Sequence, residues 1–206
     1  SQLSTNVIHA GELPSVDYER LGQHFTPTLL LWAPLLGLIG GAALPLVQVG
    51  LITAAGLTLH RLALGLLPER TANWLTYGFF AGNALIGPTL GNYTDLCQLP
   101  LAVFILMLGL VERRLWWITG AALWIPLIRE DTGVLLVAIG LWLLLRQQQL
   151  WPLAMALIAW GGGWVLICTN LLMPLFSDDN AKRFMVENFG QYLGDENSSS
   201  SLGMVG

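Results

Sequence analysis

Long apolar runs, separated by short polar turns, constrain the fold of this chain more than any other feature of its sequence. The runs cover residues 44–67, 71–90, 96–111, 115–128, 132–145 and 150–175. Charged residues make up only 11% of the chain, whereas soluble domains contain about 25%. A helix of about 20 apolar residues crosses a bilayer core. The pattern therefore predicts an all-α, polytopic helical membrane protein with about six transmembrane helices.

Two details modify this simple series of spans. Residues 28–39 are apolar but interrupted by Pro34, and a helix of this length covers only about 18 Å. Because the hydrocarbon core is about 30 Å thick, we expect a short re-entrant or interfacial helix there. Three consecutive glycines, residues 161–163, lie inside the last apolar run and predict a bend in that helix.

The polar stretches divide the chain into three parts. Residues 1–27 are expected to form an outer loop, residues 28–175 a transmembrane helical domain, and residues 176–206 an outer polar segment. Apolar residues in the last segment predict a short amphipathic helix on the membrane surface. Because the chain has no initiator Met, it is expected to be a fragment of a longer protein.

Three consecutive charged residues, at positions 129–131, lie between the apolar runs 115–128 and 132–145. Each of these runs has 14 residues and covers about 21 Å as a helix. If their other ends are anchored at one membrane surface, the charged turn stops several Å short of the opposite surface. Charged, irregular backbone at that depth is stable only where it lines a watered, protein-walled cavity.

This geometry predicts an outward-facing pocket with Asp95, Glu130 and Asp131 near its floor. The polar turn at Asp95 precedes a run of 16 residues, so this acid should be less deeply recessed. The alternative is structural. Arg129 could form an ion pair with Glu130 or Asp131 that does no more than stabilise the turn.

The basic residues assign the turns to two membrane faces, because adjacent spans alternate sides. One set of turns holds five arginines and two acids, and the other holds four basic residues and eleven acids. The positive-inside rule places the first set in the cytoplasm. Its arginines are Arg61, Arg70, Arg113, Arg114 and Arg146. The outer face then carries residues 1–26, 92–95, 129–131 and the C-terminal segment.

Three motifs adjoin the predicted spans: His-Phe-Thr-Pro at 24–27, Asn-Tyr-Thr-Asp at 92–95, and Arg-Glu-Asp-Thr-Gly at 129–133. Together they resemble DUF2079, an uncharacterised family of prokaryotic membrane proteins, and the similarity runs through nearly the whole chain. By hydropathy and layout that family is similar to the type C glycosyltransferase fold. The resemblance implies a fragment of a larger, multi-pass protein of the prokaryotic cell membrane. Type C enzymes take sugars from polyprenyl-phosphate carriers and use acids on the outer face.

The chain departs from these families at two points. Members of DUF2079 usually carry a His where Thr94 stands here, so a metal or proton role for that His cannot be transferred. In type C enzymes the principal acid usually lies in the first outer loop, within which this chain begins. Asp17 is the only aspartate of that stretch, and the resemblance does not support it.

The reaction that the resemblance implies needs a base for an acceptor hydroxyl and charge stabilisation for a departing phosphate. The candidate catalytic residues are therefore Asp131, Glu130 and Asp95. The cofactor is left unknown: the same acids could hold a divalent metal ion, but the sequence has no Cys/His metal cluster. The candidate substrate-binding residues are His24, Asn92, Arg129, Lys182 and Arg183.

Two other function classes remain open beside the enzyme. The charges could line the path of a transporter or lipid-handling protein, or the chain could be a non-catalytic scaffold. A transporter should show an internal repeat and acids near mid-membrane, whereas here the charges cluster toward one face. The net charge of −4 argues against a nucleic-acid partner. The expected partners are membrane lipids and a lipid-linked sugar.

Overall fold

The computed structural model of the chain describes residues 4–7, 16–19, 25–82 and 93–172. The chain divides into two compact units. One unit, Thr26–Leu166, holds the helices that concern the site and is called the helical unit below. The other consists of Ser1–Phe25 and Ile167–Gly206.

The N-terminal part of the second unit contains a two-stranded antiparallel ladder. Strand β1 (Ser4–Val7) pairs with β2 (Val16–Glu19), so that Ser4 lies opposite Glu19. Apolar and polar residues alternate along β2, which is the pattern of a strand. The polar stretch that we expected to be a loop therefore includes short strands. They were not predicted from the sequence because the alternation extends over only four residues.

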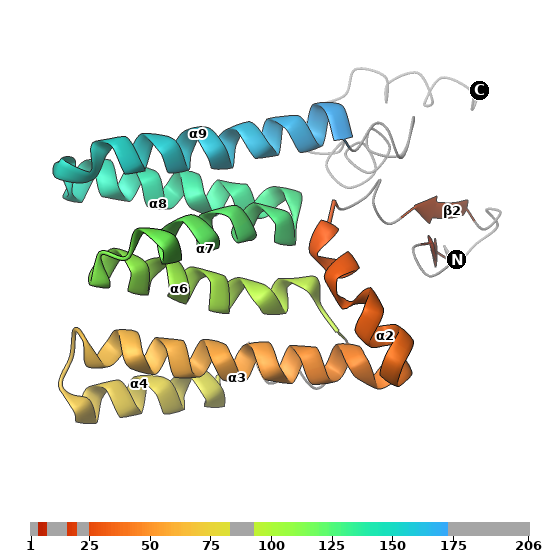
Figure 1. Cartoon of the computed structure of the whole chain (residues 1–206), viewed down its shortest axis with the longest axis horizontal. Helices are drawn as coiled ribbons and strands as arrows, with labels where there is room; N and C mark the ends of the chain where they lie inside the picture. The colour runs from red at the N-terminus through yellow and green to blue at the C-terminus, as the bar shows by residue number, and fades with distance from the viewer. Residues whose placement is uncertain (1–3, 8–15, 20–24, 83–92, 173–206) are drawn as a thin grey trace, which may run out of the picture. The chain divides into compact units, whose positions relative to one another are not determined.

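The helical unit has a helix at each position where the sequence predicts a span (Figure 1). This result confirms the helical membrane fold, although α4 is described only as far as Ala81 and residues 83–92 lie outside the described residues. Three helical stretches of the described chain are long and apolar enough to cross a membrane: Pro27–Leu64, Asp95–Glu112 and Gln148–Leu172. The helices are α3 (Ala43–Leu64), α4 (Glu69–Ala81), α6 (Leu99–Glu112), α7 (Leu115–Ile128), α8 (Gly133–Arg146) and α9 (Trp151–Ile167).

The short apolar run before α3 is helical but separate from it. It comprises a 3₁₀ helix, η1 (Pro27–Trp32), followed by α2 (Ala33–Ile39). Gly40 then takes a φ of 64°, in the left-handed region that favours glycine. The chain turns there, and α2 and α3 point in different directions in Figure 1. A short helix before the first long span is therefore confirmed.

The buried core joins α6, α7, α8 and α9, and its fully buried members include Leu106, Ile125 and Leu136. Large apolar side chains also cover the outside of the helices. For example, Leu38 is 80% and Leu145 is 81% exposed. Apolar side chains on both the inside and the outside are expected for helices surrounded by lipid.

Glycines 161–163 do not produce the predicted bend: α9 is continuous from Trp151 to Ile167 and has no sharp bend in Figure 1. Gly161 serves close packing instead. A Cβ at Gly161 would contact the carbonyl oxygen of Gly133 and lie 2.8 Å from the Cβ of Leu136. Helices α8 and α9 therefore approach each other more closely than any larger residue would allow.

Hydrogen bonds identify the two ends of the helical unit. At one end the amide of Thr94 donates to Oε1 of Gln48, near the start of α3, over 2.9 Å. At the other end Nε of Arg61, near the end of α3, donates to Oε1 of Glu112 over 3.0 Å. Helices α3 and α6 are thus parallel, and α7 returns antiparallel to α6. We call the end with Asp95 and residues 129–132 the turn end, and the end with Arg61, Arg113, Arg114 and Arg146 the arginine end.

Candidate functional site

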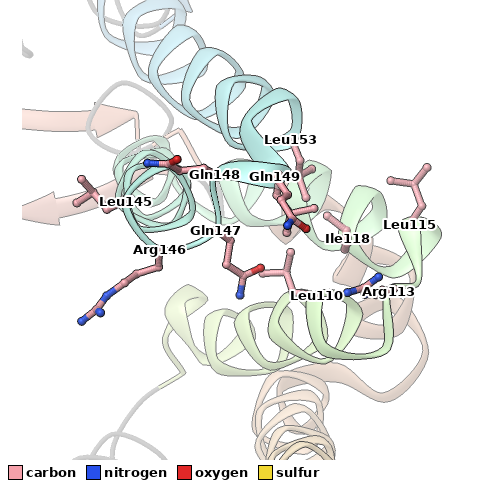
Figure 2. Close-up of a pocket in the computed structure, with 11 residues that line it drawn as sticks. Leu110, Arg113, Leu115, Ile118, Leu145, Arg146, Gln147, Gln148, Gln149 and Leu153 are labelled. Atoms are coloured by element: carbon pink, nitrogen blue, oxygen red, sulfur yellow. The ribbon is translucent and has the colours of Figure 1, made fainter.

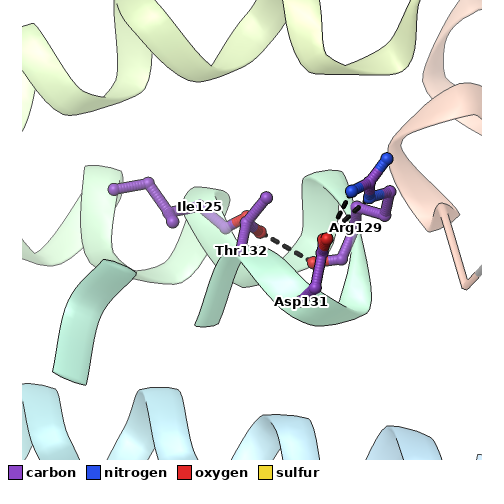
Figure 3. A network of polar contacts seen from close by, with 4 residues as sticks. All are labelled: Ile125, Arg129, Asp131 and Thr132. Atoms are coloured by element: carbon purple, nitrogen blue, oxygen red, sulfur yellow. Dashed lines mark hydrogen bonds and ion pairs between the residues drawn. The ribbon is translucent and has the colours of Figure 1, made fainter. Parts of the chain in front are cut away.

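The charged turn between α7 and α8 is shaped by its own backbone and by one hydroxyl group. Arg129 is extended, with φ −160° and ψ 150°, so α7 stops at Ile128. In a continuing helix the carbonyl of Ile125 would accept the amide of Arg129. Here the hydroxyl of Thr132 lies 2.5 Å from that carbonyl oxygen and 2.7 Å from the carbonyl oxygen of Arg129 (Figure 3). Thr132 therefore caps the helix end and fixes the turn.

Arg129 and Asp131 form a two-pronged ion pair across this turn (Figure 3). Nε of Arg129 donates to Oδ1 of Asp131 over 2.7 Å, and Nη2 donates to Oδ2. This hydrogen bonding raises the pKa of Arg129, and the charges of Asp131, Glu130 and Asp95 add to the effect. The two hydrogen bonds to Asp131 hold the guanidinium in a fixed orientation. Of the two pairings that the sequence allowed, the structure forms Arg129 with Asp131.

The remaining two acids of the turn end are buried. Asp95 is 6% and Glu130 is 8% exposed, and they belong to the 3₁₀ helices η3 (Asp95–Gln98) and η4 (Glu130–Thr132). By contrast, the side chain of Asp131 is 50% exposed. The structure thus gathers all three candidate catalytic acids at one end of the helical unit, in different environments.

A buried amide side chain, Gln98, links several segments of the turn end. It was not among the residues predicted from the sequence. Gln98 is fully buried, and its Nε2 lies 3.0 Å from Oγ1 of Thr28 and 3.3 Å from the carbonyl oxygen of Asp95. Its Oε1 accepts the indole N–H of Trp124 over 3.3 Å. One side chain therefore joins η1, η3 and α7 beneath the acids.

The signal that could have identified Gln98 is its polarity in an apolar setting. A primary amide that is buried without hydrogen bonds costs free energy, so its position implies partners from other elements. Gln48 is a second case: it is 2% exposed, within α3, and accepts the amide of Thr94. Both amides hold the backbone around Asp95 in place.

Helix α7 contains a proline close to the site, and α9 compensates for it. Pro126 has no N–H, so the carbonyl of Ala122 loses its partner within the helix. The indole N–H of Trp160, on α9, donates to this carbonyl over 3.0 Å. The last turn of α7 is therefore stabilised by a residue of α9, which is distant in the sequence but adjacent in space.

Four candidate substrate-binding residues, His24, Asn92, Lys182 and Arg183, lie outside the described residues. Within the described ranges, no group of three or more His, Cys, Asp or Glu side chains has the geometry to hold a metal ion.

Comparison with known proteins identifies the family of the chain. The family described as "Predicted membrane protein (DUF2079)" matches residues 2–205. Comparisons with curated proteins and with solved structures give no match. The family description agrees with the apolar helices and confirms the resemblance carried by the motifs. The chain therefore belongs to the DUF2079 family of predicted membrane proteins.

Proposed function

We propose that the turn end is the substrate site of a glycosyltransferase-like membrane enzyme that uses a polyprenyl-phosphate-linked sugar. The observation that carries the proposal is the set of buried acids, Asp95 and Glu130, beside an oriented, charged Arg129. Acidic side chains buried at the end of an apolar bundle cost free energy, and such groups usually serve a functional site. The similarity of the family layout to type C glycosyltransferases supplies the reaction class.

In this proposal Arg129 binds the phosphate of the donor. A guanidinium presents parallel N–H groups that fit two phosphate oxygens, as they fit the two carboxylate oxygens of Asp131 here. Asp131 holds the guanidinium in this orientation before the donor binds. Asp131 is then a positioning residue, which refines its predicted catalytic role.

The reaction needs one proton acceptor. The oxygen of the acceptor hydroxyl attacks the anomeric carbon, and the bond from that carbon to the phosphate oxygen breaks. The electron pair of the broken bond stays with the phosphate on the lipid carrier, where Arg129 stabilises the charge. The hydroxyl proton passes to a carboxylate, for which Glu130 and Asp95 are the candidates.

The lengths of α7 and α8 indicate how a lipid-linked donor can reach the turn end in this proposal. Helices α7 and α8 have 14 residues each and cover about 21 Å, so the turn end lies below one surface of a core about 30 Å thick. The arginines of the other end favour the cytoplasm. We therefore place the turn end at the outer face of a prokaryotic membrane, recessed where a lipid carrier can reach it.

The test measures ligand-dependent thermal stability of the full-length protein in lipid nanodiscs. Polyprenyl-phosphate sugar and the bare polyprenyl phosphate are added to wild type, Arg129→Gln and Glu130→Gln. A ligand present at 100 times its Kd stabilises the folded protein by about 2.7 kcal/mol. Glu112→Gln is the matched control, because Glu112 is an acid of the arginine end.

We expect a stability shift in wild type and in the control, and a reduced shift in Arg129→Gln with both ligands. Glu130→Gln should keep the shift with both ligands, because in the proposal Glu130 is a candidate base and does not hold the phosphate. No shift with any polyprenyl-phosphate sugar in wild type contradicts the proposal. Transport, lipid handling or a scaffold role would then be the better interpretation of the turn.

A further inference from the structure

A pocket at the arginine end is separate from the candidate site. It lies where the α6–α7 turn faces the α8–α9 turn, and its volume is about 890 Å³. Arg113 and Arg146 line it together with Gln147, Gln148 and Gln149 (Figure 2). The rest of its lining is leucine and isoleucine. Ligand pockets have volumes of about 300–1,000 Å³, so this one is large enough for a lipid headgroup and the first part of its chains.

The charge of the pocket has one sign. None of its lining residues is acidic. In the described part of the chain neither Arg113 nor Arg146 forms an ion pair, whereas Arg61 and Arg114 are both paired with Glu112. The pocket therefore carries two guanidinium groups and three amides around an apolar lining, with Arg113 and Arg146 on opposite sides of it in Figure 2.

The backbone at Arg113 is unusual. Its φ is 54°, and it is the only described non-glycine residue with a positive φ. The amide of Arg114 donates to the carbonyl of Gly109 over 2.9 Å across this position, a helix ending that normally has glycine where Arg113 stands. A bulky residue in this conformation is strained, and such strain is concentrated at functional sites.

Aromatic residues indicate the depth of the pocket in the membrane. Trp116 and Trp151, in the first turns of α7 and α9, are 68% and 61% exposed. Exposed tryptophans at helix ends are typical of the headgroup level of a bilayer. Basic pockets between helices at that level bind anionic headgroups.

We propose that the pocket at the arginine end binds the phosphate headgroup of an anionic membrane lipid. Arg113 contacts the phosphate, Arg146 adds positive charge on the opposite side of the pocket, Gln147 and Gln149 contact the polar substituent, and the leucines cover the start of the acyl chains. This ligand remains at the surface opposite the turn end and takes no part in the proposed transfer reaction.

The test counts lipid molecules bound to the full-length protein by native mass spectrometry in a neutral detergent. Phosphatidylglycerol, phosphatidylcholine and inorganic phosphate are titrated separately. The variants are Arg113→Gly, which removes the charge and relieves the strained backbone, and Arg146→Gln. The matched control is Arg70→Gln, because Arg70 is exposed at the start of α4 and does not line the pocket.

We expect one phosphatidylglycerol to be retained by wild type in preference to phosphatidylcholine. Each pocket variant should weaken its retention about fivefold, and Arg70→Gln should leave it unchanged. Equal weakening by Arg70→Gln would reduce the effect to general surface charge and overturn the proposal. Equal retention of phosphatidylcholine, or saturation of the site by inorganic phosphate alone, would overturn it as well.

Discussion

The close approach of α8 and α9 predicts a large difference between two substitutions only two residues apart. Gly161 and Gly163 both lie in α9. A Cβ at Gly161 would lie 2.8 Å from the Cβ of Leu136 and would contact the backbone of Gly133. A Cβ at Gly163 would have nothing within 4 Å. Alanine should therefore be tolerated at position 163 and should destabilise the protein at position 161.

The expected magnitude follows from this geometry. Carbon atoms pack at about 3.5–4.0 Å, so α8 and α9 must separate by about 1 Å to accept Gly161→Ala. Overpacking of this kind costs about 1–3 kcal/mol. Alanine also gains about 1 kcal/mol of helix propensity over glycine, but Gly163→Ala gains the same amount. The difference between the two variants thus isolates the steric cost of about 1–3 kcal/mol.

The assay is equilibrium unfolding of the full-length protein by SDS in mixed micelles. We expect Gly161→Ala to unfold at a lower SDS fraction than wild type, and Gly163→Ala at an equal or higher fraction. Equal stability of the two alanine variants would refute the close packing of α8 against α9.

Three other contacts near the site can be tested by the same unfolding assay. Trp160→Phe should cost about 0.5–1.5 kcal/mol, because the carbonyl of Ala122 loses its donor. That cost should largely disappear in a Pro126→Ala background, and an unchanged cost would contradict the compensation. Thr132→Val should cost about 1 kcal/mol, whereas Thr132→Ser keeps the capping hydroxyl and should not. Asp131→Asn should cost under about 1 kcal/mol, since the carboxylate is half exposed; a larger loss would make the ion pair chiefly structural.

The positions of the helices could be predicted from the sequence because each apolar run is long and ends at charged or polar residues. Arg113 and Arg114, for example, separate α6 from α7 where the hydropathy falls. The turn at residues 129–131 could be identified because charge is rare in this chain. These features are local in sequence, and hydropathy reports them directly.

Contacts between distant segments could not be predicted in this way. Gln98 bonds to Thr28, which is 70 residues away, and Trp160 bonds to Ala122 on another helix. From the sequence alone, the glycines of α9 predict a bend. The packing role of Gly161 could not be predicted, because it depends on the facing residues of α8. Which acid would pair with Arg129 also depended on the extended backbone at that residue.

In the proposed arrangement, α7 and α8 hold the turn end and the arginine end at opposite membrane surfaces. Single-cysteine variants Asp131→Cys and Gln148→Cys, with native Cys97 and Cys168 replaced by alanine, test it in sealed, oriented vesicles with a membrane-impermeant maleimide. Asp131 and Gln148 are both exposed in the structure. We expect Asp131→Cys to react only from the outer side and Gln148→Cys only after the vesicles are opened. Labelling of both cysteines from the same side would contradict it.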